Sequence, residues 1–195
     1  MNTNVKNRQK MNTRDIFTVV LLALINVVLF FASALLYATP ITIMLMPIFF
    51  SLLEGIVFFI IGSKVQKRGA IMIYCVVRGI LGGYLPYVIL YLLAGVIGEL
   101  VMWKTHYGNA KGLTISYIII QVFASIGSTI YPYAITFQSL AGKSVADGRA
   151  ANITEAAEIL QSGGAVVLLV GVVICAFIGA RIGKKIAEKH LASMN

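Results

Sequence analysis

Three ionisable side chains interrupt long apolar stretches of this chain: Glu54, Arg78 and Glu99. A charge in apolar surroundings is costly, so such residues normally pair with one another or face a cavity. Either Arg78 is neutralised by one or both carboxylates and holds helices together, or the three groups relay protons or ions. The structural pair is favoured because a relay needs polar groups on both sides of it, whereas these three cluster on one side.

Aromatic and polar residues collect near the opposite ends of the same apolar stretches. Tyrosine rings stack on flat molecules while their hydroxyls hydrogen-bond, which favours a pocket for a planar or amphipathic small molecule. An interfacial aromatic belt is the alternative, but a belt places tyrosines at both membrane faces. Six of the nine tyrosines fall at this one end. The candidate substrate-binding residues are Tyr84, Tyr87, Tyr91, Gln121, Tyr131, Tyr133, Gln138 and Met44, and Ser125 and Ser128 could extend the pocket inward.

Small residues mark a third set of candidates. Gly179 and Gly183 have the four-residue spacing that lets two helices approach closely in a membrane, and Ala23 lies within the first apolar stretch. Internal helix packing explains such residues in most membrane proteins. Contact with another subunit is the alternative.

The sequence offers no catalytic set and no metal or cofactor site. Gly142-Lys143-Ser144 resembles the end of a phosphate-binding loop, but Phe137 stands where its leading glycine would be. His106 and His190 lie in unmatched contexts, and no Ser-His arrangement or buried Asp supports hydrolysis or metal binding. We therefore expect a protein that is not an enzyme.

These candidates must be positioned in lipid. The 195-residue chain is 59% hydrophobic and only 12% charged, whereas a soluble domain carries about 25% charged residues. So few charges cannot cover a water-facing surface of this size, so the bilayer must be the solvent for much of the chain.

The apolar stretches predict an all-α, polytopic membrane protein with six transmembrane helices. A span needs about 20 apolar residues. The stretch 70–103 is too long for one span, and Gly82, Gly83 and Pro86 break it, so we expect a short third helix over 70–83. The first stretch is longer than a signal-peptide core and should be retained. The remaining spans are expected at 16–36, 41–61, 84–103, 113–137 and 163–181, between a basic N-terminus (1–14) and a short C-terminal tail (191–195), with residues 15–190 forming a single domain.

Charge then sets the orientation. Cytoplasmic segments of membrane proteins are enriched in Lys and Arg, and this topology with both termini in the cytoplasm places thirteen of the sixteen there. The net charge of +9 therefore needs no nucleic-acid partner. The thirteen are Lys6, Arg8, Lys10, Arg14, Lys64, Lys67, Arg68, Lys104, Lys111, Arg181, Lys184, Lys185 and Lys189.

The one long external connection, about 139–162, contains a helix signal. Asn152 and Glu155 have the spacing of a capping box, and Ile153, Ala156 and Leu160 repeat at helical spacing. The pattern predicts either a short amphipathic helix over the external mouth or a plain surface helix.

Three stretches resemble the Trep_Strep group of substrate-binding S components of energy-coupling factor (ECF) transporters. They are Pro40-Ile41-Thr42-Ile43-Met44-Leu45-Met46-Pro47, Ala94-Gly95-Val96-Ile97-Gly98-Glu99-Leu100 and Phe177-Ile178-Gly179-Ala180-Arg181-Ile182-Gly183-Lys184-Lys185. The size, six helices and short third helix fit the same group. One departure concerns the first helix, where many S components carry Ala-x-x-x-Ala and this chain has Ala23 between Val19 and Val27.

The resemblance implies a multi-pass protein of a bacterial plasma membrane that captures a vitamin-like micronutrient from outside. It also implies partners: a coupling transmembrane subunit and two cytoplasmic ATPases. An intramembrane enzyme acting on lipid or peptide, or a stand-alone carrier, would be the alternatives.

Overall fold

In lipid, a backbone can satisfy its own polar groups only as helices or closed barrels, and the apolar stretches of this chain form helices. The computed structural model describes residues 10–32, 39–136 and 150–192, and no strand occurs among them. The helices are α1 (Thr13–Ala32), α2 (Pro40–Lys64), α3 (Ala70–Leu81), α4 (Leu85–Thr105), α5 (Ala110–Ser125) continued by the π-helical η3 (Ile126–Ile135), α7 (Ala150–Ile159) continued by η5 (Leu160–Gly164), and α8 (Ala165–Ala192).

The predicted six-helix membrane architecture is confirmed. Among the described residues, four helical stretches are long and apolar enough to cross a bilayer: Pro40–Lys64, Leu85–Thr105, Ala110–Ile135 and Ala151–Lys189. The third helix is short as expected, because α3 has 12 residues and at about 1.5 Å per residue spans only part of a ~30 Å hydrocarbon layer.

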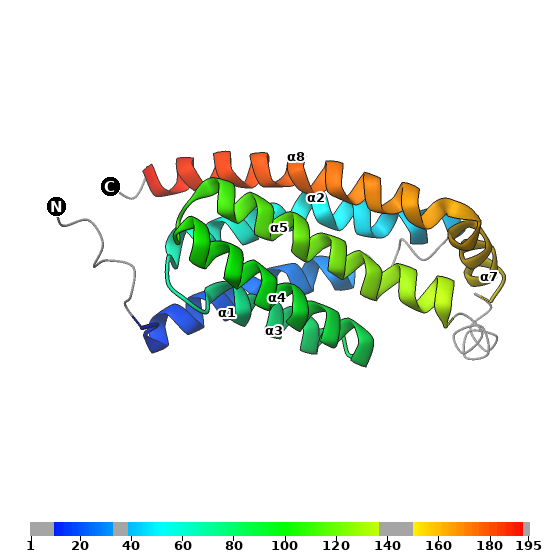
Figure 1. Ribbon diagram of the computed structural model, residues 1–195, viewed down its shortest axis with the longest axis horizontal. Helices are drawn as coiled ribbons and strands as arrows, with labels where there is room; N and C mark the ends of the chain where they lie inside the picture. The colour runs from blue at the N-terminus through cyan, green and yellow to red at the C-terminus, as the bar shows by residue number, and fades with distance from the viewer. Residues whose placement is uncertain (1–9, 33–38, 137–149, 193–195) are drawn as a thin grey trace.

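The helices form one elongated bundle with two distinct ends (Figure 1). At one end, α1 begins, α8 ends, and the connections 65–69 and 106–109 join α2 to α3 and α4 to α5. We call this the basic end, because Lys64, Lys67, Arg68, Lys104 and Lys111 lie at it. At the other end, α7 lies across the bundle beside the start of α8 (Figure 1). The turn between α3 and α4 stops short of that end.

The closest helix contact joins α2 to α8 through glycines. A Cβ atom added at Gly179 would lie 2.5 Å from the Ser51 carbonyl oxygen, and one added at Gly55 would lie 2.5 Å from the Gly179 carbonyl oxygen. Gly183 likewise faces the Gly55 carbonyl. The structure thus places Gly179 and Gly183 at an internal contact where the two backbones touch.

Ala23 also lies at an internal position. It is fully buried in the same core cluster as Val19, on the face of α1 turned toward the bundle. Leu21 and Val28, on other faces of α1, are exposed.

The helix predicted in the long connection is present as α7, but its start was placed wrongly. The helix already includes Ala150 and Ala151, so Asn152 lies inside it and is no N-cap. The apolar face is buried as the pattern indicated: Ile153, Ala156 and Leu160 pack in one cluster with Ile43, Tyr133, Leu168 and Val172.

The α2–α8 contact makes a stability prediction. Gly179→Ala should lower the free energy of unfolding by about 1–3 kcal/mol, because its Cβ would press on backbone that cannot move alone. Gly171→Ala in the same helix is the control, since its Cβ would meet only the flexible tip of Ile48 at 2.8 Å. Both variants gain the same helix propensity, which cancels in the comparison. Thermal unfolding in detergent micelles measures the difference; equal effects would contradict the close-contact account.

Candidate functional site

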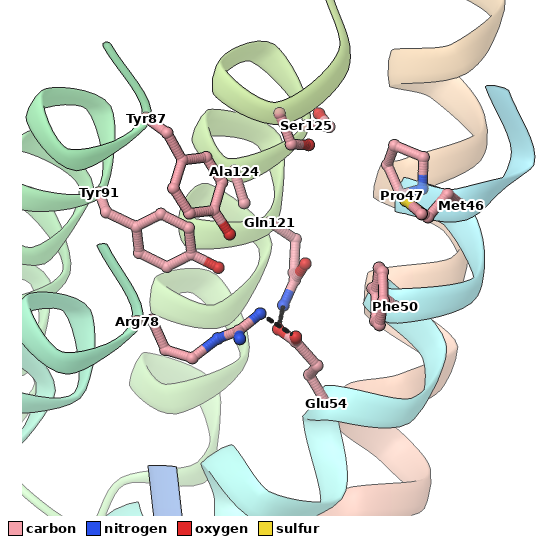
Figure 2. Close-up of a pocket in the computed structure, with 11 residues that line it drawn as sticks. Met46, Pro47, Phe50, Glu54, Arg78, Tyr87, Tyr91, Gln121, Ala124 and Ser125 are labelled. Carbon is pink, nitrogen blue, oxygen red and sulfur yellow. Dashed lines mark hydrogen bonds and ion pairs between the residues drawn. The ribbon is translucent and has the colours of Figure 1, made fainter. Parts of the chain in front are cut away.

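A buried ion pair lies in the middle of the bundle. Arg78 donates through Nη2 to the Glu54 Oε1, and Gln121 donates through Nε2 to the Glu54 Oε2 at 3.0 Å (Figure 2). Arg78 Nη1 also donates to the Asn26 carbonyl oxygen at 3.4 Å. Glu54, Arg78 and Gln121 are all at least nine-tenths buried. Four helices, α1, α2, α3 and α5, are therefore linked through one guanidinium and one carboxylate.

Local structure explains why these side chains meet. Arg78 lies in the last turn of α3, where a cation is favoured by the helix dipole. Because α3 is short, its last turn ends at mid-depth in the bundle rather than at the far membrane face. Glu54 lies near the middle of α2, directly before the glycine that contacts α8. A short helix and a long one thus bring opposite charges to the same depth.

The ion pair forms the floor of a pocket (Figure 2). The pocket lies on the α7 side of the pair, because Met46 of α2 and Ser125 of α5, which line it, lie farther from the basic end than Glu54 and Gln121. The cavity itself measures about 30 Å³, and the empty space in and around it, open solvent included, comes to about 350 Å³. Tyr87 and Tyr91 of α4 stand on one side, and Met46, Pro47 and Phe50 of α2 stand on the facing side (Figure 2). The complete lining is Met46, Pro47, Phe50, Glu54, Arg78, Tyr87, Tyr91, Gln121, Ala124, Ser125 and Ser128.

The two pocket tyrosines are closely arranged. Their ring centroids lie 4.7 Å apart in an edge-to-face geometry, and the Arg78 guanidinium lies 6.0 Å from the centroid of the Tyr91 ring. Among the described residues, the Tyr91 hydroxyl and the Arg78 Nε have no hydrogen-bond partner, although both are buried. Two polar groups at the base of the pocket are therefore left unsatisfied by the protein.

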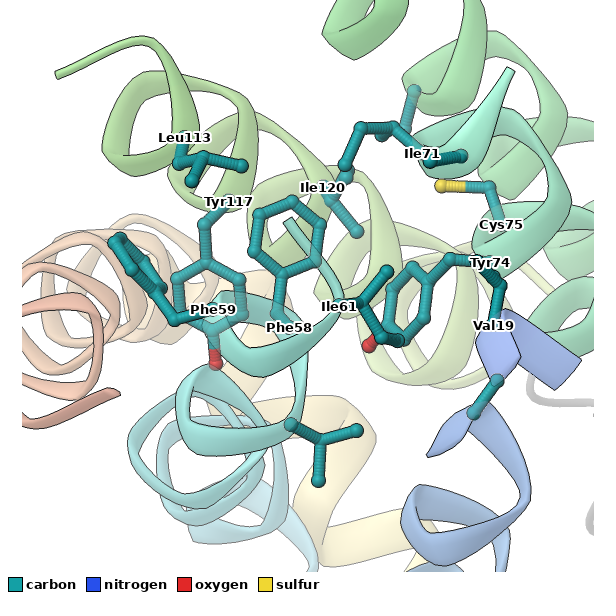
Figure 3. Close-up of a cluster of buried hydrophobic side chains, with 14 of the residues drawn as sticks. Val19, Phe58, Phe59, Ile61, Ile71, Tyr74, Cys75, Leu113, Tyr117 and Ile120 are labelled. Atoms are coloured by element: carbon teal, nitrogen blue, oxygen red, sulfur yellow. The ribbon is translucent and has the colours of Figure 1, made fainter. Parts of the chain in front are cut away.

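Aromatic side chains fill the bundle beneath the floor. Phe58, Tyr74 and Tyr117 each stand one helical turn toward the basic end from Glu54, Arg78 and Gln121 respectively. The Phe58 ring centroid lies 5.4 Å from that of Tyr74 and 5.2 Å from that of Tyr117 (Figure 3). The Tyr117 hydroxyl donates to the Ser51 carbonyl oxygen at 2.7 Å. The ion pair thus rests on a packed aromatic layer.

Of the tyrosines, glutamines and methionine proposed from sequence, Tyr87, Tyr91 and Gln121 line this pocket, as do Ser125 and Ser128. Tyr84 and Tyr131 lie beside each other, with ring centroids 6.4 Å apart, and neither is a lining residue. Tyr133 and Met44 belong to the cluster under α7. Gln138 lies outside the described residues.

The α2 wall of the pocket was missed from the sequence. Met46, Pro47 and Phe50 precede Glu54 by eight, seven and four residues, which places them on the same helix face as that carboxylate. The signal that could have identified them is their position four, seven and eight residues before Glu54, on the same face of the helix.

Glu99 lies apart from the ion pair and serves another helix. Its carboxylate accepts hydrogen bonds from the backbone N–H groups of Gly69 at 2.5 Å and Met72 at 3.3 Å, at the start of α3. Gly69 has φ +97°, a conformation that favours glycine. Tyr107 donates to the Glu99 Oε1 at 2.7 Å, and burial together with this bond raises the pKa of Tyr107. Glu99 is therefore a helix cap held by a tyrosine.

Long apolar helices around a buried charge pair define a polytopic integral membrane protein. The chain belongs to the Trep_Strep family, described as hypothetical bacterial integral membrane proteins, whose family model matches residues 13–192. No curated protein and no solved structure matches the chain.

The ion pair predicts strong coupling between its partners. Arg78→Gln alone should cost about 3–5 kcal/mol of unfolding free energy, because it leaves a buried carboxylate without its counter-charge. Adding Glu54→Gln should restore part of that loss. Thermal unfolding of both single variants and the double variant measures the coupling. The exposed pair of Lys184 and Glu188, 3.7 Å apart, is the control and should show no measurable coupling. Additive effects at Glu54 and Arg78 would contradict the pairing.

The Glu99 cap predicts a change in the pKa of Tyr107. Glu99→Ala should lower that pKa toward the usual value of about 10, because it removes the acceptor and the negative charge that hold the phenol protonated. Ultraviolet titration reports phenolate formation, and subtracting the Tyr107→Phe counterpart of each protein isolates this one side chain. An unchanged pKa would show that burial alone sets it.

Proposed function

We propose that this protein is a membrane-embedded substrate-binding subunit of an ECF-type importer. The observation that carries the proposal is a pocket with an aromatic wall and a polar floor, set between the middle of the bundle and the end opposite the basic clusters. The positive-inside bias assigns the basic end to the cytoplasm, so the pocket faces outward and receives a vitamin-like or other micronutrient.

The packing beneath the pocket supports capture rather than passage. The layer of Phe58, Tyr74 and Tyr117 separates the pocket from the basic end within the described part of the bundle. A bound molecule can reach the cytoplasm only if the subunit itself moves or is reoriented. That requirement fits a binding subunit that relies on other proteins for energy.

The resemblance to S components supplies the rest of the proposal. The partners are a coupling transmembrane subunit and two cytoplasmic ATPases, and the membrane is the bacterial plasma membrane. Val19, Ala23 and Val27 are buried inside the bundle, so this face of α1 does not contact the coupling subunit, which binds other residues. Exposed side chains such as Phe17 and Leu24 remain available on that helix.

A reconstitution experiment tests the proposal. The chain is co-expressed with candidate coupling and ATPase subunits, purified through a tag on this chain, and placed in liposomes. We expect the subunits to co-purify, and mass spectrometry to find a small molecule whose uptake requires ATP. Solute flux through this chain alone would indicate a stand-alone carrier. Failure to associate with any ATPase set would overturn the assignment.

A matched pair of variants ties the molecule to the pocket. Tyr91→Phe removes a hydroxyl at the base of the pocket and should reduce the co-purified molecule at least fivefold. Tyr117→Phe removes a buried hydroxyl from the layer beneath and should leave the molecule in place. Equal retention by both variants would place the binding site elsewhere.

A further inference from the structure

We propose that the pocket binds an uncharged, planar heteroaromatic molecule through a hydrogen-bond acceptor, such as a carbonyl oxygen or ring nitrogen, directed at Tyr91 and Arg78. This inference rests on the proposed function only for the premise that the pocket holds a small molecule.

The charge balance of the floor selects an uncharged ligand. The ionisable residues that line the pocket, apart from its two tyrosines, are Glu54 and Arg78, and they neutralise each other. Both are at least nine-tenths buried, so solvent does little to screen their charges. An anion entering beside them would leave a net negative charge in low dielectric, and a cation a net positive one. An arginine in a pocket would ordinarily be expected to bind an anionic ligand, but Arg78 is already neutralised by Glu54.

The unsatisfied groups of the floor select an acceptor. Arg78 uses Nη2 on Glu54 and Nη1 on Asn26, while its Nε has no partner among the described residues. The Tyr91 hydroxyl, in a side chain that is 1% exposed, also has none. Both can donate, and an unmade buried hydrogen bond is costly. The two Glu54 oxygens already accept from Arg78 and Gln121.

The walls select a flat ring. Tyr87 and Tyr91 stand edge to face on one side, while Met46, Pro47 and Phe50 form the facing side (Figure 2). Aromatic and apolar surfaces that face one another favour a planar ring between them. The tyrosine hydroxyls point toward the floor side of this space, where the ring's acceptor would be placed (Figure 2).

Probe pairs that differ only in charge test the inference. Nicotinamide with nicotinate, and quinoline-3-carboxamide with quinoline-3-carboxylate, are titrated near pH 7.5 against the ligand-free protein in nanodiscs. Saturation-transfer NMR gives the Kd of each probe. We expect wild-type protein to bind at least one carboxamide at least tenfold more tightly than its carboxylate. Binding of no probe, equal binding within both pairs, or preference for the carboxylates would each overturn the inference.

Two variants separate charge from hydrogen bonding. Glu54→Gln leaves Arg78 without its counter-charge and should change the binding preference at least tenfold in favour of the carboxylates. Glu99→Gln is the control: it removes an intramembrane carboxylate that lies outside the pocket and should keep the wild-type preference. An unchanged preference in Glu54→Gln would overturn the charge argument. If Glu54→Gln fails to fold, Tyr91→Phe provides the test. This variant should bind the carboxamides at least fivefold more weakly than wild type, and within each pair the carboxamide should still bind more tightly than the carboxylate. Undiminished carboxamide affinity would overturn the inference.

The outcomes also distinguish this inference from the proposed function. A protein that associates with ATPase subunits but prefers carboxylates retains the importer assignment and loses the ligand class. A protein that prefers carboxamides but never meets an ATPase retains the ligand class and loses the importer assignment.

Discussion

The structure depends on the neutralisation of Arg78 by Glu54. Placing either charge alone in the middle of a membrane bundle would be costly, and the pair is acceptable only because its geometry supplies both counter-charge and hydrogen bonds. Gln121 and the Asn26 carbonyl complete that set and bring α5 and α1 to the same point. The relative depth of four helices is thus constrained by a few polar atoms, in a solvent where apolar contacts alone specify depth poorly.

The short third helix is what makes this pairing possible. A helix that crossed the whole hydrocarbon layer would carry its last turn to the membrane face, far from the middle of α2. α3 ends at Leu81 and leaves Arg78 at mid-depth. Its other end is fixed by Glu99, which takes the N–H groups of Gly69 and Met72 that the helix cannot satisfy itself. Two of the three intramembrane charges therefore act on the two ends of one 12-residue helix.

Much of this arrangement could be predicted from sequence. The apolar stretches indicated the helices, Gly82 and Pro86 indicated the break after α3, and Glu54 was one of the two carboxylates expected to neutralise Arg78. The role of Glu99 could not be predicted, because its partners are backbone N–H groups and a loop tyrosine, which leave no charge pattern. Tyr133 and Met44 were assigned to a pocket because tyrosine and methionine suit a binding wall and a buried cluster equally well. Only the position of α7, which covers both, separates the two roles.

The pocket owes its character to the same constraint. Its α2 wall is held close to α8, because Gly55, directly after Glu54, touches the α8 backbone at Gly179. The guanidinium, by contrast, belongs to a short helix whose start is held at the basic end by Glu99. The floor of the pocket therefore joins a carboxylate on a helix packed tightly against α8 to a cation on a short helix whose start is capped by Glu99.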